Sequence, residues 1–212
     1  MTETADTGHK GRGGEGGQRS YHHGDLRRAI MDAVLELVRE RGVNGFTLSE
    51  AARRANVSVA APYRHFADRD AVITAAATEG FTALADTLET VVRAHAEDPA
   101  ALPEEMSAVY VAFAAASPAR FALMFTSGLD KTGATELLAA ADRAHSALLD
   151  AVAHLPADPE ATASRLWAIA HGVAILAAND LLTPHFATGE NTDTVVRSAV
   201  RAWAAGLTAG HR

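Results

Sequence analysis

The sequence predicts an all-α protein, and three observations support this. Apolar residues recur at spacings of three and four along most of the chain, which is the period of an amphipathic helix. No segment alternates with period two, as a half-buried strand does. Capping residues and prolines mark the ends of these segments, and together they divide the chain into roughly nine helices without an internal repeat.

The first predicted helix follows a glycine-rich segment. Residues 1–19 contain many glycines and no apolar stretch, so a flexible tail is predicted rather than a signal peptide or a transit helix. Apolar positions at helical spacing then predict a helix from Asp25 to Val38, and Gly42 supplies its C-terminal stop.

Two short helices joined by a tight turn are predicted next. Thr47 and Glu50 have the spacing of a reciprocal capping box, which begins a helix. Asn56 tolerates a left-handed backbone and ends it. Ser58 can cap a third helix that reaches about Phe66. This arrangement is a helix-turn-helix.

The remaining chain predicts about six further helices. The first is unusually long, beginning after the cap Asp68 and ending at Asp98-Pro99. The others are bounded by proline, glycine and capping residues, over residues 103–116, 118–125, 132–155, 158–182 and 193–209. The uncharged runs within them are shorter than the ~18–20 residues needed to cross a bilayer, so no membrane partner is predicted.

Composition and charge narrow the function classes. The chain has no cysteine, which excludes disulfides, thiolate catalysis and cysteine-bound metals and favours a cytoplasmic protein. Residues 1–65 carry ten Lys and Arg against eight Asp and Glu, whereas the rest carries nine against eighteen. The slightly basic N-terminal segment could therefore bind a polyanion such as a nucleic acid. A solvent-exposed helix face would have the same charge pattern.

The segment Thr47–Val72, TLSEAARRANVSVAAPYRHFADRDAV, resembles the DNA-binding segment of the tetracycline-repressor (TetR) family. Tyr21–Arg27 resembles the entry to the first helix of many members, and Trp167 with His171-Gly172 resembles a tryptophan-histidine-glycine (WHG) C-terminal subfamily. The resemblance implies a homodimeric repressor that binds a palindromic double-stranded operator and is released by a small effector. It implies a DNA-binding domain over residues 20–66 and an effector-binding and dimerisation domain over residues 67–212.

The matching positions give candidate DNA contacts. In a helix-turn-helix the second helix enters the major groove, and flanking groups hold phosphates. The groove-facing candidates are Ser58, Val59, Ala60, Ala61 and Arg64, and the phosphate candidates are Thr47, Tyr63, His65 and Arg69. Each also has a structural interpretation as a cap or a packed side chain.

The segment departs from the family pattern at three positions. Pro62 removes an amide donor early in the recognition helix, so a tightened or displaced first turn is predicted. Asn56 stands where the family usually has glycine, and Arg69 where it usually has lysine. Neither of these two changes threatens the fold.

The C-terminal half offers two further candidate sites. A largely apolar effector pocket is predicted from the aromatic and sulfur side chains of two helices and a polar pair on a third, Met106, Tyr110, Phe113, Phe125, Trp167 and His171. A dimer interface is predicted from two apolar stripes, Leu166, Ile169, Val173 and Leu176 with Val196, Val200, Trp203 and Leu207. A well-packed intrachain core would use the same residues in both cases.

Other function classes have weaker support. An all-helical enzyme or small-molecule-binding protein that uses His145 or His171 is the main alternative, but no nucleophile or acid partner stands at motif spacing. No metal-binding pattern or cofactor-binding glycine motif occurs, so neither a metal nor a cofactor is predicted. A non-specific nucleic-acid-binding protein is a third possibility. It is disfavoured because the net negative charge of residues 66–212 would repel a polyanion lying along them.

Overall fold

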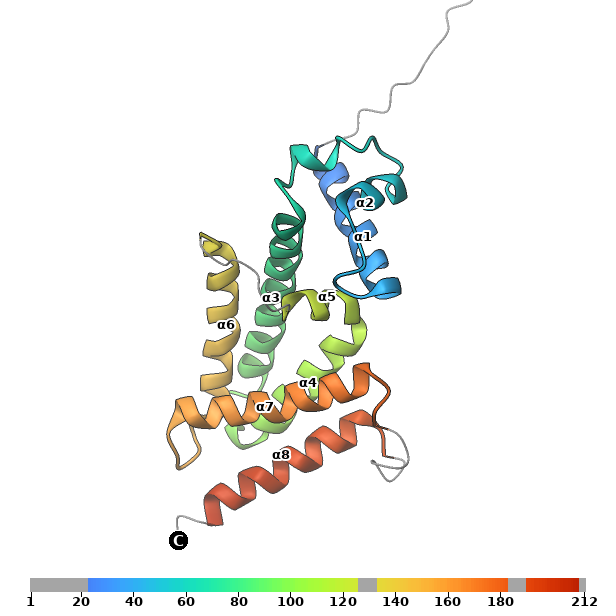
Figure 1. The fold of residues 1–212 in the computed structure, drawn as a ribbon. Coiled ribbons are helices and arrows are strands. Elements are labelled where there is room, and N and C mark those ends of the chain that lie inside the picture. The colour runs from blue at the N-terminus through green and yellow to red at the C-terminus, as the bar shows by residue number, and fades with distance from the viewer. Residues whose placement is uncertain (1–22, 126–132, 183–189, 210–212) are drawn as a thin grey trace, which may run out of the picture.

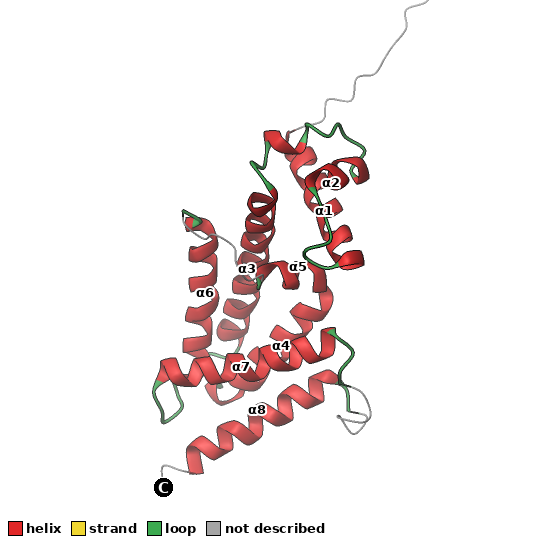
Figure 2. Cartoon of the chain, in the orientation of Figure 1, coloured by secondary structure: helices red, strands yellow, loops and turns green. Residues whose placement is uncertain are grey.

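The computed structural model of the protein describes residues 23–125, 133–182 and 190–209, and within them every regular element is helical (Figure 2). The all-α prediction is therefore confirmed. The predicted tail, residues 1–19, lies outside the described residues. The elements in chain order are α1 (His23–Arg41), α2 (Leu48–Arg54), the 3-10 helix η1 (Pro62–Arg64), α3 (Arg69–Ala94), the 3-10 helix η2 (Pro99–Ala101), α4 (Leu102–Ala116), α5 (Pro118–Met124), α6 (Thr135–Val152), α7 (Pro159–Ala178) and α8 (Thr192–Ala209).

Local capping chemistry sets the boundaries of α2 and α3. The Glu50 amide donates to the Thr47 hydroxyl at 3.2 Å, and the Thr47 amide donates to the Glu50 carboxylate at 3.0 Å. This is the predicted capping box, which satisfies two orphan donors of the helix. Asn56 has a φ of 56° and is left-handed, as predicted, and Asp68 caps α3 by accepting from the Ala71 amide at 2.8 Å.

The helices enclose two hydrophobic cores that share α3, and Figure 1 shows α1 and α2 beside one end of this helix and α7 and α8 towards the other. The first core joins α1, α2 and the first turns of α3, with Ile30, Leu37 and Ile73 among its fully buried side chains. The second core joins the rest of α3 to α4, α6, α7 and α8. Since α3 contributes to both cores, the domain boundary at residue 66 stays a prediction.

A sharp bend brings α5 against the first core. The axes of α4 and α5 differ by 109°, and Pro118 begins α5 directly after the bend. Ala119 and Leu123 of α5 are buried in the first core with α1, whereas Phe121 and Met124 are buried in the second. The seven residues of α5 therefore link the two cores.

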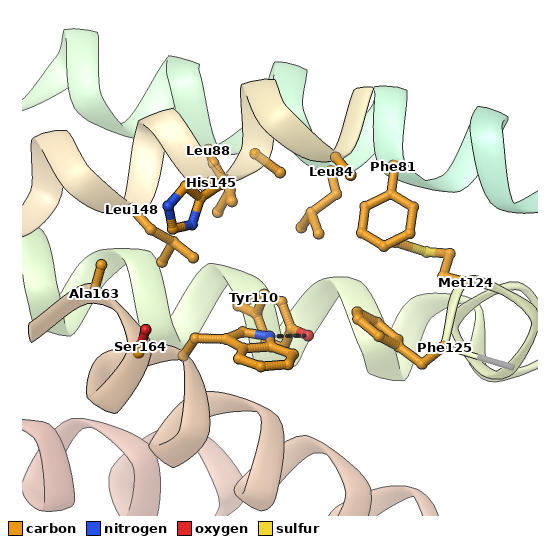
Figure 3. A pocket seen from close by; sticks show the side chains of 13 residues that line it. Phe81, Leu84, Leu88, Tyr110, Met124, Phe125, His145, Leu148, Ala163 and Ser164 are labelled. Carbon is orange, nitrogen blue, oxygen red and sulfur yellow. Dashed lines mark hydrogen bonds between the residues drawn. The ribbon is translucent and has the colours of Figure 1, made fainter. Parts of the chain in front are cut away.

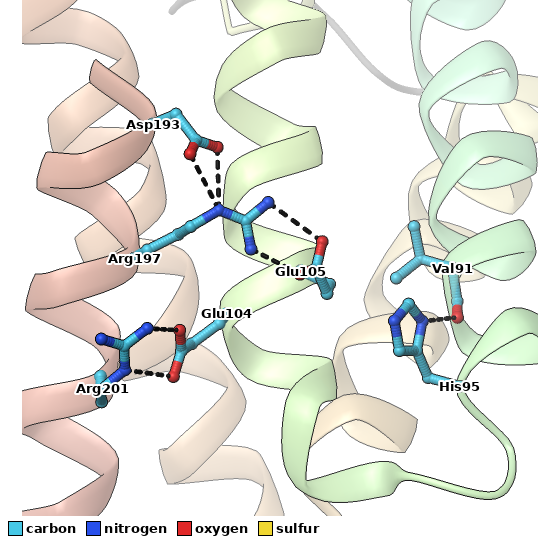
Figure 4. A network of polar contacts seen from close by, with 7 residues as sticks. All are labelled: Val91, His95, Glu104, Glu105, Asp193, Arg197 and Arg201. Carbon is cyan, nitrogen blue, oxygen red and sulfur yellow. Dashed lines mark hydrogen bonds and ion pairs between the residues drawn. The ribbon is translucent and has the colours of Figure 1, made fainter. Parts of the chain in front are cut away.

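Ion pairs fix the outer helices to the bundle. Arg197 of α8 forms a bidentate pair with Glu105 of α4, at 2.6 and 3.1 Å, and its Nε also binds Asp193 (Figure 4). Arg201 pairs with Glu104 one turn further along α8, at 2.6 Å. Because bidentate arginine–carboxylate pairs are directional, these contacts set the register of α8 on α4.

Candidate functional site

The predicted recognition helix is replaced by turns and one 3-10 helix. The Ala61 amide donates to the Ser58 carbonyl at 2.9 Å, and the His65 and Phe66 amides both donate to the Pro62 carbonyl at 2.9 Å. A proline has no amide of its own to continue an α-helix from Ser58. The prediction of an α-helix from Ser58 to Phe66 is therefore wrong, and the displacement attributed to Pro62 extends over the whole segment.

This segment nevertheless presents a surface to solvent. Ser58, Ala60 and Arg64 are exposed, and the side chains of Val59 and Tyr63 are 44% and 56% exposed although both are largely apolar. Ala61 is buried, so its assignment as a groove-facing residue is wrong. It packs inward beside Pro62, which is also buried.

Two arginines on this surface are available to a partner. Within the described residues, Arg53 on α2 and Arg64 on η1 are exposed and form no ion pair. Arg54 differs, because it holds Glu40 of α1 through two hydrogen bonds of 2.6 and 2.8 Å. Arg53 and Arg64 therefore offer their full charge to an anionic partner.

Three candidate phosphate contacts are occupied or partly covered within the chain. Thr47 is held in the capping box, and His65 is partly buried beside Phe66. Arg69 donates to the carbonyl of Val43 and stacks 4.8 Å from the Phe46 ring centroid. Arg69 thus connects the start of α3 to the loop after α1, and any role in DNA binding would be added to this structural one.

The second candidate site is a cavity of about 470 Å³ between α3, α4, α5, α6 and α7 (Figure 3). This volume falls in the range of small-molecule pockets. The described residues that line it are mostly apolar and include no Lys, Arg, Asp or Glu. They are Phe81, Leu84, Leu88, Tyr110, Met124, Phe125, Ala141, Ala144, His145, Leu148, Ala163, Ser164 and Trp167.

The structure brings only part of the predicted pocket to this cavity. Tyr110, Phe125 and Trp167 line it. His171 lies behind them, with its ring 4.6 Å from the Phe125 ring and 5.3 Å from the Trp167 ring, between centroids. Met106 is buried in the second core, and Phe113 packs against that core without lining the cavity.

A hydrogen-bonded chain connects three of these residues. The Trp167 indole N–H donates to the Tyr110 hydroxyl at 3.3 Å, and this hydroxyl lies 2.8 Å from Nδ1 of His171. Burial lowers the pKa of the His171 imidazole and raises the pKa of the Tyr110 phenol. Both groups are therefore neutral near pH 7, and the imidazole tautomer of His171 sets which of the two donates in their shared hydrogen bond.

The lowered pKa of His171 predicts acid sensitivity. The folded protein favours the neutral ring, so stability is fully present above the ordinary histidine pKa of about 6.5 and is lost as pH falls from there through the folded-state pKa. We expect His171→Gln to reduce the loss of Tm between pH 7.5 and 5. A control variant of an exposed histidine, His154→Gln, is expected to keep the wild-type slope, and equal slopes for all three proteins would contradict this prediction.

Sequence reasoning missed most of the cavity wall. Leu84 and Leu88 lie within the long helix predicted after Asp68, and neither they nor Ala141 and Leu148 of α6 carry a sequence signal that distinguishes a cavity wall. Apolar residues that line a cavity and those that fill a core have the same helical spacing. Only the packing of α6 on α3, which Arg143 supports through Asp86 and Glu89 at 2.7 and 2.9 Å, places them together.

The predicted interface residues divide into buried and exposed sets. Leu166, Val173, Val196 and Val200 are buried in the second core of the same chain, as the intrachain alternative holds. Ile169 and Trp203 pack against this core and Leu207 is partly exposed, while the side chain of Leu176 is 40% exposed. Fully buried side chains such as Leu166, Val196 and Val200 are not accessible to a partner, so this part of the predicted stripe belongs to the core of the chain itself.

Two further searches of the described residues bear on function. They contain no group of three or more His, Cys, Asp or Glu side chains that could hold a metal ion. Of the helices in these ranges, α7 is long and apolar enough to cross a membrane, and the bent pair ending in α5 passes the same test as one span. This is weak evidence, since core helices of soluble proteins pass it as well.

Comparison with known proteins identifies the family. The model described as "Bacterial regulatory proteins, tetR family" matches residues 30–76, and that described as "Tetracyclin repressor-like, C-terminal domain" matches residues 103–203. A search of the curated proteins finds no match.

Solved structures agree over nearly the whole chain. A protein of unknown function from a Rhodococcus species is 31% identical, with a TM-score of 0.73 over 90% of this chain and 99% of that one. The TetR family transcriptional regulator PfmR from Thermus thermophilus is 14% identical, with a TM-score of 0.65 over 81% of this chain and 91% of that one. AibR, solved with isovaleryl coenzyme A and operator DNA, is 17% identical, with a TM-score of 0.62 over 82% of this chain and 96% of that one. The two family matches and the shared fold show that this chain belongs to the TetR family of bacterial transcriptional regulators.

Proposed function

We propose that the protein is a repressor that binds a palindromic operator as a homodimer and is released by a small, largely apolar effector. The observation that carries this proposal is the position of α5, which contributes Leu123 to the core beneath the helix-turn-helix and Met124 and Phe125 to the cavity wall. A ligand in the cavity therefore contacts the same short helix that supports the DNA-binding segment. Such a protein acts where the chromosome is, so we propose a cytoplasmic location.

The enzyme alternative is not supported. TetR-family regulators are DNA-binding transcription factors, and this chain is not an enzyme. The WHG subfamily stays a prediction that rests on Trp167 and His171-Gly172.

Homodimerisation is supported by the uncovered face of α7. Only 33% of its most apolar window is buried within the chain. The exposed positions Ala168, Gly172, Ile175 and Leu176 follow one side of the helix, and the side chains of Ile175 and Leu176 are each 40% exposed. We name these four residues the α7 face. A contiguous apolar helix face of this kind is typical of a protein interface, and a second copy of α7 and α8 would complete a four-helix bundle.

Release by the effector follows from linkage. If a ligand binds better to a conformer whose two recognition segments no longer match successive major grooves, it shifts the dimer toward that conformer. DNA then weakens effector binding by the same factor by which the effector weakens DNA binding. The solved structure of AibR, which has this fold, contains isovaleryl coenzyme A and operator DNA, so a protein of this fold can bind both kinds of partner.

The DNA-binding function is tested by selecting bound sequences from a random-sequence DNA pool and then titrating variants by fluorescence anisotropy. Arg64→Ala is expected to relax the sequence preference by about 10–100-fold if Arg64 contacts a base, since one such contact is worth ~1–3 kcal/mol. Arg53→Ala is expected to weaken all DNA binding and to reduce the salt slope by about one phosphate contact.

The control for both variants is Arg93→Ala, because Arg93 is equally charged and lies at the far end of α3 with its side chain 67% exposed. It is expected to bind DNA like the wild type. A wild-type protein that selects no sequence from the pool would refute the operator proposal.

A further inference from the structure

The cavity has one fully apolar end. Figure 3 shows Phe81, Met124 and Phe125 at one end of the space and His145 and Ser164 at the other. The apolar lining continues between them along α3 through Leu84 and Leu88. A ligand that fills this space buries an apolar body, whose transfer out of water supplies the main part of its affinity.

The polar atoms of the aromatic wall are already satisfied. The Tyr110 hydroxyl accepts from Trp167 and is hydrogen-bonded to Nδ1 of His171, so it already has two partners within the chain. A ligand that hydrogen-bonded here would have to break a bond inside the chain, and the exchange would gain little. The polar part of a ligand therefore belongs at the opposite end.

The state of His145 is set by its partner. Nε2 of His145 lies 3.1 Å from Oε2 of Glu160, and an ionised carboxylate only accepts hydrogen bonds, so Nε2 carries the proton. Nδ1 is the ring nitrogen that remains for a ligand, and it accepts a hydrogen bond when the ring is neutral. Within the described part of the chain neither Nδ1 of His145 nor the hydroxyl of Ser164 is in a hydrogen bond. The polar end thus offers one acceptor and one hydroxyl.

The described wall offers an ionised ligand head no counterion of its own. No Lys or Arg lines it, and an anionic head beside His145 would be repelled by the carboxylate of Glu160. A cationic head would have to compete with His145 for the carboxylate of Glu160, since no acidic side chain lines the cavity itself within the described residues. A neutral head avoids both costs.

We infer that the effector is a neutral, largely apolar molecule with one hydroxyl group, which forms its hydrogen bonds at the end of the cavity that His145 and Ser164 line. A hydroxyl group supplies one donor and an acceptor at the same atom, which matches the two free groups at this end of the cavity. This inference rests on the effector control proposed above and adds the chemical class and orientation of the ligand.

The test is calorimetric titration of the full chain with four probes that share one apolar body. The probes are 4-hexylphenol, hexylbenzene, 4-hexylbenzoate and 4-hexylbenzylamine. The phenol is expected to bind about tenfold more tightly than hexylbenzene, because one or two net hydrogen bonds contribute about that much to the affinity. It is also expected to bind more tightly than the benzoate or the benzylamine ion. His145→Ala and Ser164→Ala are expected to remove the preference for the phenol while hexylbenzene binds as before.

The matched controls are His154→Ala and Ser198→Ala, which replace exposed residues of the same types outside the cavity wall and are expected to keep the preference. Equal binding of phenol and hexylbenzene, tighter binding of either ion, no binding of any probe, or a preference that survives both cavity variants would each overturn the inference. Operator release by 4-hexylphenol is measured in parallel. Selective binding without release would support the ligand class and contradict the regulatory function.

Discussion

Replacing Leu123 by alanine is expected to lower the free energy of unfolding by about 2–5 kcal/mol, the range for a buried leucine that leaves a cavity. The Leu123 side chain is 0% exposed and lies in the core formed by α1, α2 and the start of α3. The residue itself comes from α5, far along the chain from the helix-turn-helix. The loss would therefore show that the DNA-binding segment depends on a helix of the C-terminal half.

Urea unfolding followed by circular dichroism measures this effect. The control is Leu138→Ala on α6, where the side chain is 47% exposed and the expected change is within about 0.5 kcal/mol. A Leu123→Ala protein as stable as the wild type would mean that α5 does not support the first core.

Replacing Leu176 by aspartate is expected to give a folded monomer whose operator affinity is lower by a factor of about 10²–10⁴, the gain that two linked half-site contacts provide. A carboxylate on the α7 face would be desolvated in the proposed dimer but remains in water in the monomer. Val200→Asp is a poor choice for the same purpose, because Val200 is 0% exposed within its own chain and a charge there would unfold the protein.

Light scattering and operator titration distinguish the outcomes for Leu176→Asp. Leu138→Asp places the same charge on a similarly exposed leucine of α6 and is expected to remain dimeric. A wild-type monomer, or a dimer that persists in Leu176→Asp, would contradict the use of the α7 face as the interface.

Local chemistry made much of the fold predictable. The capping box of Thr47 and Glu50, the left-handed Asn56 and the caps Asp68 and Asp158 are all determined by residues within three or four positions of one another, and the structure confirms each. Of the two exposed arginines near the turn, Arg64 was predicted from the family resemblance of the segment rather than from capping chemistry.

Long-range packing explains what the sequence did not reveal. The recognition segment was predicted as a helix from its capping residue Ser58, but the missing amide of Pro62 outweighed this local signal. The stripe Leu166, Val173, Val196 and Val200 has the spacing of an interface and of a core, and only the contacts of α7 and α8 with α4 decide for the core. The same ambiguity hid the cavity wall on α3 and α6.

Because α5 contacts both the cavity and the first core, it limits which substitutions can change the effectors that this protein binds. A change at Met124 or Phe125 alters the cavity but moves a helix whose other face holds Leu123 in the core under the DNA-binding segment. Ala141 and Leu148 of α6 and Ser164 of α7 line the same space without contributing to that core. A library randomised at these three positions should therefore yield variants that bind new ligands and still bind the operator. A library randomised on α5 should yield mainly variants that no longer bind the operator.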